Sequence, residues 1–120
     1  MKVYKLTEIE EKFAEIIWQR EPVASGDLVK ICDKEMNWKK STMYTVLKKI
    51  CEKGILQNKD AVVTSLITRD EYYSKQSRNF VENRFGGSLP KFLTAFISDE
   101  KLSSQEAEEL KRLIDEYKEI

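Results

Sequence analysis

The most informative absence in this chain of 120 residues is histidine, which does not occur at all. Histidine supplies the usual general base, the imidazole metal ligand and the activating partner of serine or cysteine nucleophiles. Without it, an active site would need a pair of carboxylates in a pocket, and no such spacing stands out. The sequence therefore predicts that the protein is not an enzyme and that it has no catalytic residue.

Cysteine is almost as scarce, because only Cys32 and Cys51 are present. The two are too far apart for the Cys-x-x-Cys spacing of zinc sites, and no histidine is available to complete a metal site. Two reduced thiols packed in a core are the favoured interpretation. We therefore expect neither a bound metal nor a cofactor.

Long apolar runs are also missing. The first residues, MKVYKLTEIEEK, are charged, and no apolar segment reaches the roughly 18 residues of a membrane span. Hydrophobic residues nevertheless make up 41% of the chain and charged residues 35%, which is typical of a helix-rich globular protein. The sequence predicts a cytoplasmic protein with no membrane insertion.

A net charge is absent too, since 21 basic side chains balance 21 acidic ones. The overall basic character that often marks nucleic-acid-binding proteins is therefore missing. The balance conceals a local excess, because residues 30–59 hold only three acidic side chains against eight lysines, at positions 30, 34, 39, 40, 48, 49, 53 and 59. This excess of positive charge centres on residues 38–50, WKKSTMYTVLKKI.

What the chain does contain is helical periodicity separated by capping and turn signals. Thr7 and Glu10 have the spacing of a capping box and predict a first helix. The predicted helices of the first half cover residues 8–19, residues 25–35 with Ser25 as the cap, and residues 38–53, which Gly54 ends. Residues 55–67 indicate a two-stranded hairpin, and Val23 leaves room for a very short strand.

Three helices with a short strand between the first two and a hairpin after the third are typical of a winged helix-turn-helix. We assign residues 1–68 to this DNA-binding domain. Residues 69–120 carry three further amphipathic helices, for which Thr68, Ser88 and Ser103 are candidate caps. The predicted fold class is therefore mainly α with a small β-hairpin, a winged helix-turn-helix followed by a C-terminal helical domain.

The C-terminal domain is too small to bury enough surface for independent stability. Pairing with a second copy would supply the missing apolar contacts, so we expect residues 69–120 to form the dimerisation domain of a homodimer. The candidate dimerisation residues are the apolar and aromatic side chains of its three helices: Tyr73, Phe80, Phe85, Phe92, Leu93, Phe96, Leu110, Ile114 and Tyr117.

The lysines at the start of the third helix oppose its dipole, because a helix N-terminus carries about half a positive charge. A solvated polar face is one interpretation of them. DNA phosphates are the other, since they would turn both the lysines and the free N–H groups into contacts. The candidate DNA-binding residues of the third helix and the wing are Lys39, Lys40, Ser41, Thr42, Tyr44, Thr45, Lys48, Lys49 and Lys59.

A protein of another class would fit the same residues. In this alternative the winged helix is a protein-interaction module, whose basic face meets an acidic protein partner while its C-terminal helices join a larger assembly. The zero net charge permits it. Binding to random duplex DNA at low salt distinguishes the two, because only the DNA-binding protein should retard the duplex.

The order of elements, the segment from Trp38 to Gly54 and the RFGGSL segment at residues 84–89 resemble the BlaI/MecI penicillinase-repressor family, to which CopY-type copper regulators also belong. The resemblance implies a homodimeric winged-helix transcriptional repressor of palindromic, double-stranded operator DNA. It carries the DNA-reading positions over to residues that are already candidates here, namely Ser41, Thr42, Tyr44 and Thr45.

The resemblance also implies a route of regulation. In penicillinase repressors a membrane sensor-protease system leads to cleavage of an Asn-Phe bond, and the matching bond here is Ala95-Phe96. The cysteine-rich copper motif of the copper-responsive branch is missing, because no cysteine follows Cys51. The resemblance therefore does not extend to metal sensing.

Overall fold

The computed structural model describes residues 4–120, so that residues 1–3, the start of the charged segment MKVYKLTEIEEK, lie outside the described residues. The chain forms two compact units. The first ends at Arg78 and the second comprises Asn79–Ile120. The boundary falls inside one helix, whose beginning belongs to the first unit.

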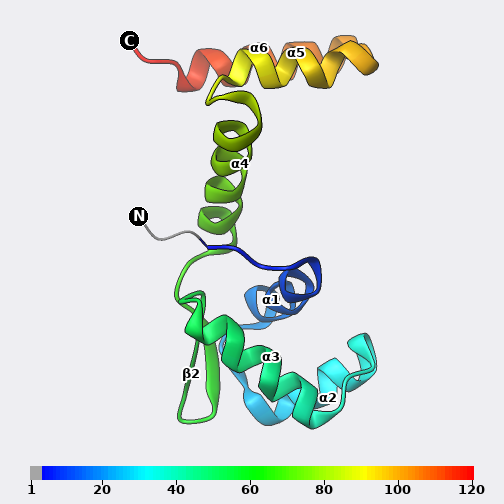
Figure 1. Cartoon of the computed structure of the whole chain (residues 1–120), viewed down its shortest axis with the longest axis vertical. Helices are drawn as coiled ribbons and strands as arrows, with labels where there is room; N and C mark the ends of the chain where they lie inside the picture. The colour runs from blue at the N-terminus through cyan, green and yellow to red at the C-terminus, as the bar shows by residue number, and fades with distance from the viewer. Residues whose placement is uncertain (1–3) are drawn as a thin grey trace. The chain divides into compact units, whose positions relative to one another are not determined.

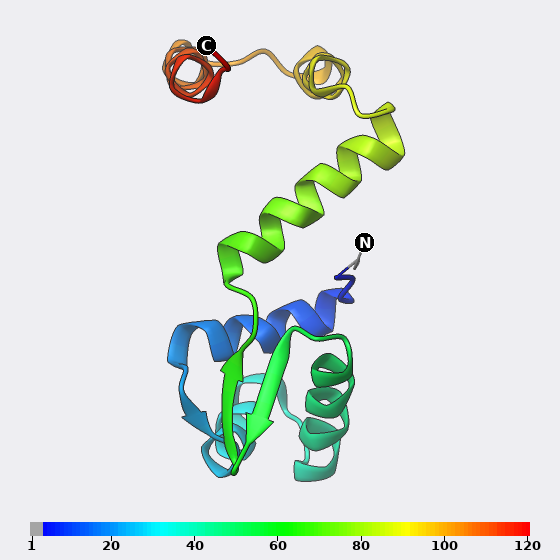
Figure 2. The ribbon, with the colours of Figure 1, turned by 90° about the vertical axis from the view of Figure 1, so that its left-hand side faces the viewer.

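The first unit is a helical domain with a small sheet (Figure 1). Its elements are α1 (Glu8–Arg20), β1 (Val23–Ala24), α2 (Ser25–Met36), α3 (Lys40–Glu52), β2 (Leu56–Lys59), β3 (Val62–Ser65) and the start of α4 (Arg69–Phe85). The strands form an antiparallel sheet in the order β1-β3-β2, which Figure 2 shows beside the helices. The predicted mainly helical, winged helix-turn-helix fold is confirmed.

Capping residues fix where α1 begins. The Thr7 hydroxyl accepts a hydrogen bond from the Glu10 N–H at 3.1 Å, and Glu10 Oε1 accepts one from the Thr7 N–H at 2.8 Å. These reciprocal bonds satisfy two donors that the helix itself leaves unpaired. The start of α2 differs from the expectation, because Ser25 is its first residue and Ala24 is an N-cap without a side-chain hydrogen bond.

The core of the first unit holds α3 in place. Met43, Leu47 and Ile50 lie on one face of α3 and are buried, together with Phe13 of α1 and Leu28 of α2. Their helical spacing leaves the opposite face of α3 to solvent. The position of the exposed face is thus set by apolar burial on the other side.

The beginning of α4 also belongs to this core. Tyr72 is completely buried, and its hydroxyl donates a hydrogen bond to Glu11 Oε2 at 2.7 Å. The Trp18 ring lies 5.6 Å from the Tyr72 ring and 6.2 Å from the Tyr73 ring, measured between ring centres, and its Nε1 donates to the Ile67 carbonyl. The first turn of α4 is therefore fixed to α1 by aromatic packing.

The second unit contains the rest of α4, α5 (Leu89–Asp99) and α6 (Ser104–Tyr117). Ser88 caps α5, and Ser103 forms a capping box at α6, as the sequence predicts. Gly86 and Gly87 follow α4 with φ of 59° and 81°, a left-handed backbone that favours glycine. Every residue of α5 and α6 is described, and none of them is buried.

The two cysteines are free thiols, Cys32 buried and Cys51 half-buried, as expected. Burial, with a smaller contribution from Glu35, raises the pKa of Cys32 to about 11, so the thiol stays protonated at neutral pH. No cluster of potential metal ligands occurs within residues 4–120. Among these residues, no helix combines the length and the apolar character needed to cross a membrane.

Candidate nucleic-acid interface

The N-terminus of α3 is open. Lys39 is the N-cap residue and provides no side-chain hydrogen bond, and the first helical bond runs from the Met43 N–H to the Lys39 carbonyl at 3.1 Å. The N–H groups of the three residues between them, 40 to 42, make no hydrogen bond to any described residue. Such a helix end carries a partial positive charge and offers donors to an anion.

The turn before α3 brings this end to the surface. Asn37 closes α2 in the left-handed conformation, with φ of 56°, and the Trp38 N–H bonds to the Cys32 carbonyl at 3.1 Å. Asparagine tolerates this conformation better than most residues. The Trp38 ring packs 5.6 Å from the Phe13 ring, measured between centres, which anchors the turn to the core. A short, fixed turn thus joins α2 to α3.

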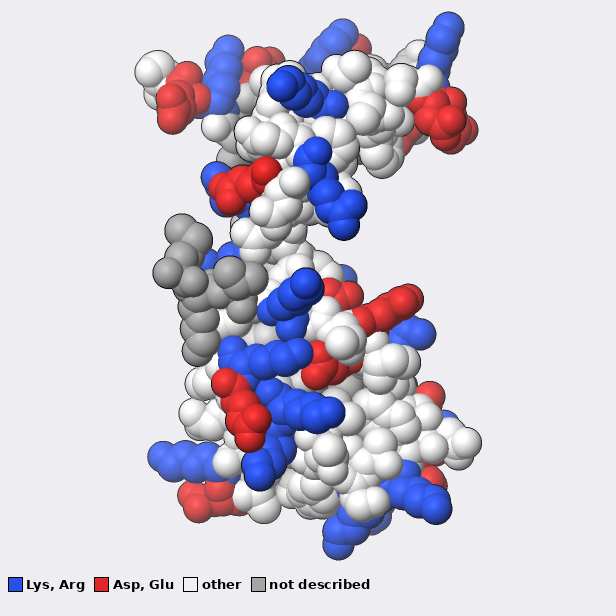
Figure 3. All heavy atoms as spheres, viewed as in Figure 1, with Lys and Arg blue, Asp and Glu red and all other residues white. Residues whose placement is uncertain are grey.

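Four lysines surround the exposed face of α3 without partners. Lys39, Lys40, Lys48 and Lys49 are exposed, and none forms an ion pair with a residue in the described part of the chain. Figure 3, drawn from the same side as Figure 1, shows basic side chains gathered over the part of the first unit where α3 lies. These charges are available to an external polyanion.

Lys53, at the other end of α3, has a structural contact instead. Its Nζ lies 2.7 Å from Glu10 Oε1 and 2.9 Å from the Lys5 carbonyl oxygen. Burial alone would raise the pKa of Glu10, but the hydrogen bonds from Lys53 and Thr7 and the Lys53 charge outweigh it, so the pKa is lowered. Lys53 therefore stabilises the start of α1.

The hydroxyl groups predicted to read DNA fall into two groups. The side chains of Ser41 and Thr42 are exposed and form no hydrogen bond with the residues that the structure describes. Thr45 is exposed as well, and its Oγ1 donates to the Ser41 carbonyl at 2.9 Å, which leaves its methyl group and acceptor lone pairs free. Ser41 and Thr45 lie on the face opposite the core, and Thr42 lies at the edge of that face.

Tyr44 and Lys59 lie elsewhere. Tyr44 is half-buried, and its hydroxyl donates to the Ser25 Oγ of α2 at 3.1 Å. Lys59 is exposed at the end of β2, paired with Val62 across the wing. The structure thus gathers the other seven candidate DNA-binding residues at the start and on the open face of α3, with Tyr44 at its edge and Lys59 in the wing. Sequence reasoning missed Ser25 as the partner of Tyr44, because nothing local marks that contact.

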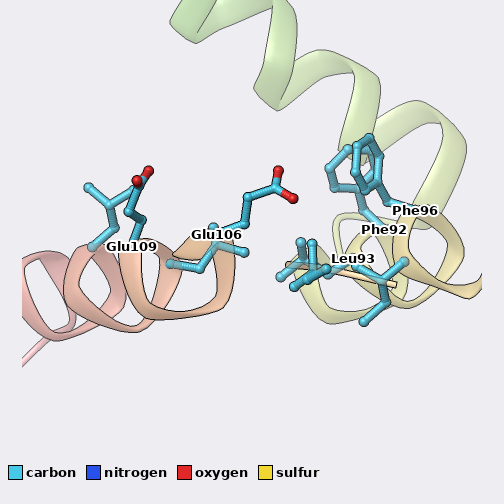
Figure 4. Close-up of a pocket in the computed structure, with 9 residues that line it drawn as sticks. Phe92, Leu93, Phe96, Glu106 and Glu109 are labelled. Atoms are coloured by element: carbon cyan, nitrogen blue, oxygen red, sulfur yellow. The ribbon is translucent and has the colours of Figure 1, made fainter. Parts of the chain in front are cut away.

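The candidate dimerisation residues of the second unit form an exposed apolar surface. Neighbouring rings of Phe80, Phe85, Phe92 and Phe96 have centres 5.4–6.1 Å apart. A groove between α5 and α6, drawn in Figure 4, is lined by Phe92, Leu93, Phe96, Ile97, Leu102, Glu106, Glu109, Leu110 and Leu113. Phe85, Leu93 and Leu110 are half-buried, whereas Phe96 is 63% exposed, Ile114 56% and Tyr117 81%.

Tyr73 and the Ala95-Phe96 bond differ from the other candidates in their place or in their predicted role. Tyr73 lies in the first unit, beside Trp18 and under the Arg69 guanidinium, apart from the other candidate dimerisation residues. The Ala95-Phe96 bond lies within α5, with both residues exposed. Regulatory cleavage at this bond stays a prediction. Sequence reasoning also missed Ile97 and Leu113 of the groove, although each follows a candidate residue, Leu93 or Leu110, at helical spacing.

A helix-turn-helix with a wing, an open basic helix end and a helical second unit defines the class of winged-helix DNA-binding proteins. The family model described as penicillinase repressor matches residues 6–116. The chain therefore belongs to the penicillinase repressor family, DNA-binding transcriptional repressors that are not enzymes. The predicted family and the predicted absence of enzymatic activity are confirmed.

The similar proteins are aligned along nearly their whole lengths. The penicillinase repressor of Bacillus licheniformis is 24% identical over 98% of this chain and 94% of its own length. The methicillin resistance regulatory protein MecI of Staphylococcus aureus (strain Mu50 / ATCC 700699) is 25% identical over 94% of this chain and 95% of its own. MecI of Mammaliicoccus sciuri is 24% identical over the same shares. The similarity therefore covers both units.

Proposed function

We propose that this repressor binds palindromic operator DNA as a homodimer, with α3 of each copy in the major groove. The observation that carries the proposal is the N-terminus of α3, where N–H groups and the side chains of Lys39 and Lys40 lie together without a partner among residues 4–120. Cations at this end of a helix cost up to about 1 kcal/mol unless an anion is near. DNA phosphates remove the cost and use the free donors.

The residues of α3 divide into two roles. Lys39, Lys40, Lys48 and Lys49 contact phosphates, because their long, flexible, charged side chains suit a backbone that is the same in every sequence. Ser41, Thr42 and Thr45 are short and exposed, so the helix can approach the base edges, and threonine methyl groups can touch a thymine methyl. Lys59 contacts the backbone from the wing. Affinity thus comes mainly from the lysines, and specificity from the hydroxyl residues.

The second unit provides the contacts between two copies, and these contacts give the dimer its two-fold symmetry. Its α5 and α6 have no buried residue, and Phe96, Ile114 and Tyr117 expose most of their surface. A soluble domain rarely leaves so much contiguous apolar surface uncovered, and a second copy provides the complementary face. In this proposal residues 1–68 bind DNA and residues 69–120 dimerise, while Tyr73 packs on the first unit.

Selection of duplexes from a random pool tests the proposal. A two-fold dimer should enrich inverted repeats whose half-sites lie about one helical turn, roughly 10 base pairs, apart. Enrichment of single, unrepeated sites would contradict the dimeric binding mode. Failure to retard any duplex at low salt would contradict DNA binding altogether and favour the protein-interaction alternative. A Lys39→Ala/Lys40→Ala double variant is the matched control, because it removes the charges at the helix end and leaves the buried face intact.

A further inference from the structure

We propose that Ser25 is a positioning residue for DNA reading, and that Tyr44 acts through it rather than by touching DNA with its hydroxyl. This inference rests on the proposed binding of DNA by α3. It assigns a role to a residue of α2 that is not a candidate DNA contact, and it gives Tyr44 a different role from the one that the family resemblance implies.

Tyr44 lies at the edge of the exposed face of α3 rather than at its centre. Residues of an α-helix are about 100° apart around its axis. Counted from the buried Met43, Thr45 therefore lies nearly opposite the core, whereas Tyr44 lies at the edge of the exposed face. The structure agrees, because the Tyr44 ring is half-buried and packs against the core cluster. Its side chain is thus directed along the protein surface toward α2.

The Tyr44 hydroxyl already forms a hydrogen bond within the protein. Its hydroxyl donates to Ser25 Oγ at 3.1 Å, and Ser25 is only 5% exposed. A phenol has a single proton, so a bond to Ser25 uses the one donor that Tyr44 could offer to a phosphate or a base. Because Ser25 is buried, this hydrogen bond is an internal contact that holds α3 against α2. We call this contact the strut.

Backbone contacts with the wing hold Ser25 in place. Its N–H donates to the Ala61 carbonyl of the wing turn at 2.9 Å. The preceding residues Val23 and Ala24 pair with Val63 and Val62 of β3. Ser25 is therefore fixed to the sheet by its backbone while its side chain holds α3. One small residue links the wing, the start of α2 and the helix that carries the reading residues.

Such a strut affects specificity more than general affinity. Contacts between lysine side chains and phosphates tolerate a small shift of α3, because the side chains are long and flexible. Contacts of Thr42 and Thr45 with base edges depend on the helix position, since short side chains cannot follow a displaced base. Loss of the strut should therefore lower the discrimination between sequences before it lowers binding to random DNA.

A double-mutant cycle tests the inference with Ser25→Ala, Tyr44→Phe and their combination. Each substitution removes one hydroxyl of the same hydrogen bond without changing charge. The probes are the duplex that the wild-type protein selects from a random pool and a shuffled duplex of equal composition. The measured quantity is the ratio of the two affinities. Ser25→Ala combined with Thr42→Ala is the control cycle, because Thr42 has no bond to Ser25.

Each single variant should lower the ratio by about 2- to 10-fold for each copy in the bound dimer, the range for one hydrogen bond, and the double variant should lower it no further. The control cycle should be additive. A loss for Tyr44→Phe alone, additive losses in the Ser25 and Tyr44 cycle, or no loss at all would overturn the inference.

The experiment also distinguishes the inferred role of Ser25 from a purely structural role and from a failure of the proposed DNA binding. A purely structural role would weaken binding to both duplexes equally and leave the ratio unchanged, which would also overturn the inference. Melting temperatures of all variants, followed by circular dichroism, account for any change in the folded fraction. If the wild-type protein itself binds no duplex, the proposed function has failed rather than the role of Ser25.

Discussion

Single lysines of α3 make a quantitative prediction about salt. Lys40 and Lys48 are exposed and unpaired within the described residues, so each is free to neutralise one phosphate. Lys40→Ala or Lys48→Ala should weaken binding to all duplexes and reduce the slope of log affinity against log salt by about two, because each copy in the dimer loses one phosphate contact. Lys111→Ala, in α6, should leave the slope unchanged. Titrations by fluorescence anisotropy at several salt concentrations measure it, and an unchanged slope for both α3 variants would contradict the phosphate role.

For Thr42 we expect the opposite result, a change in sequence preference without a change in the salt slope. Its exposed side chain has no hydrogen bond with the described residues, so its hydroxyl and methyl group are both available to a base edge. Thr42→Ala should change the preference among operator variants by about 1–3 kcal/mol while leaving the salt slope as it is. Competition binding with single-base variants of the selected duplex is the measurement. Equal losses on every sequence would show that Thr42 acts as a backbone contact instead.

The Glu10 carboxyl group leads to a prediction of how the stability of the protein changes at low pH. Its pKa is lowered in the folded protein, against the effect of burial, mainly by the contact with Lys53. A lowered pKa means stability that is present above the unfolded-state value and is lost as pH falls through the folded-state value. Glu10→Gln should lower the free energy of unfolding by about 1 kcal/mol near pH 7, since Lys53 is partly exposed.

The same variant should lose less at about pH 3 than at about pH 7, because protonation of the wild-type carboxyl group weakens its contact with Lys53 as the pH falls. Urea titrations at both pH values check this. Glu108→Gln, whose ion pair with Lys111 is fully at the surface, is the control and should have almost no effect at either pH. A Glu10→Gln effect of equal size at both pH values would contradict the electrostatic account.

At the scale of elements, the wing depends on its two-residue turn. Asp60 and Ala61 both have positive φ, 54° and 61°, between the paired residues Lys59 and Val62. Such hairpin turns favour glycine at the second position, because alanine in a left-handed conformation costs roughly 1 kcal/mol. Ala61→Gly should therefore raise the free energy of unfolding by about 1 kcal/mol, measured by urea denaturation.

Asp60→Gly serves as the matched control for the turn. Aspartate tolerates the left-handed conformation better than alanine, so this change should gain less stability. A decrease for Ala61→Gly would mean that the flexibility of glycine in the unfolded chain outweighs the relief of strain in the turn.

Local signals made most elements predictable from the sequence. Thr7 and Ser103 form the expected capping boxes, and Thr68 forms reciprocal bonds with Glu71 at 3.0 and 3.2 Å. These motifs act between neighbours in the chain, so a pattern of four residues is enough to recognise them. The helical spacing of Met43, Leu47 and Ile50 is likewise a local signal, and it accounts for the buried face of α3 and for the exposure of the candidate site on the other side.

Long-range contacts were not predictable in the same way. Tyr72 and Tyr73 follow an amphipathic pattern, but nothing in it says that Trp18, far back in the chain, is their partner. The same holds for Tyr44, whose spacing on a basic helix face suggests DNA, although its hydroxyl meets Ser25. Spacing along one helix predicts which face a residue occupies, whereas its partner depends on how separate elements pack.

At the scale of the whole molecule, the two units contrast in how they are stabilised. The first has a core of completely buried side chains, such as Phe13, Leu28 and Ile50. The second has a row of aromatic rings and an open groove, and its α5 and α6 bury no side chain. About 25 cal/mol is gained for each Å² of apolar surface removed from water. The second unit therefore has most to gain from a partner copy.

Phe96 provides the sharpest test of that partnership. It borders the groove, lies 6.1 Å from Phe92 between ring centres and is 63% exposed. Phe96→Asp places a charge where a partner copy would bury it, and should weaken dimerisation by about 2–4 kcal/mol, the range of central interface residues. Sedimentation velocity over a range of concentrations measures the monomer fraction. Thr94→Asp adds the same charge to the same helix at an exposed position outside the groove.

The DNA affinity of these variants connects dimerisation to function. In a dimer, binding of one half-site holds the second α3 near the other half-site, so the second contact forms at a high effective concentration. Phe96→Asp should therefore lose affinity for the full palindrome and keep the affinity of the wild-type protein for an isolated half-site, while Thr94→Asp keeps both. If Phe96→Asp is monomeric but binds the full palindrome as tightly as the wild-type protein, each copy reads DNA independently, and the second unit has another role than pairing two recognition helices.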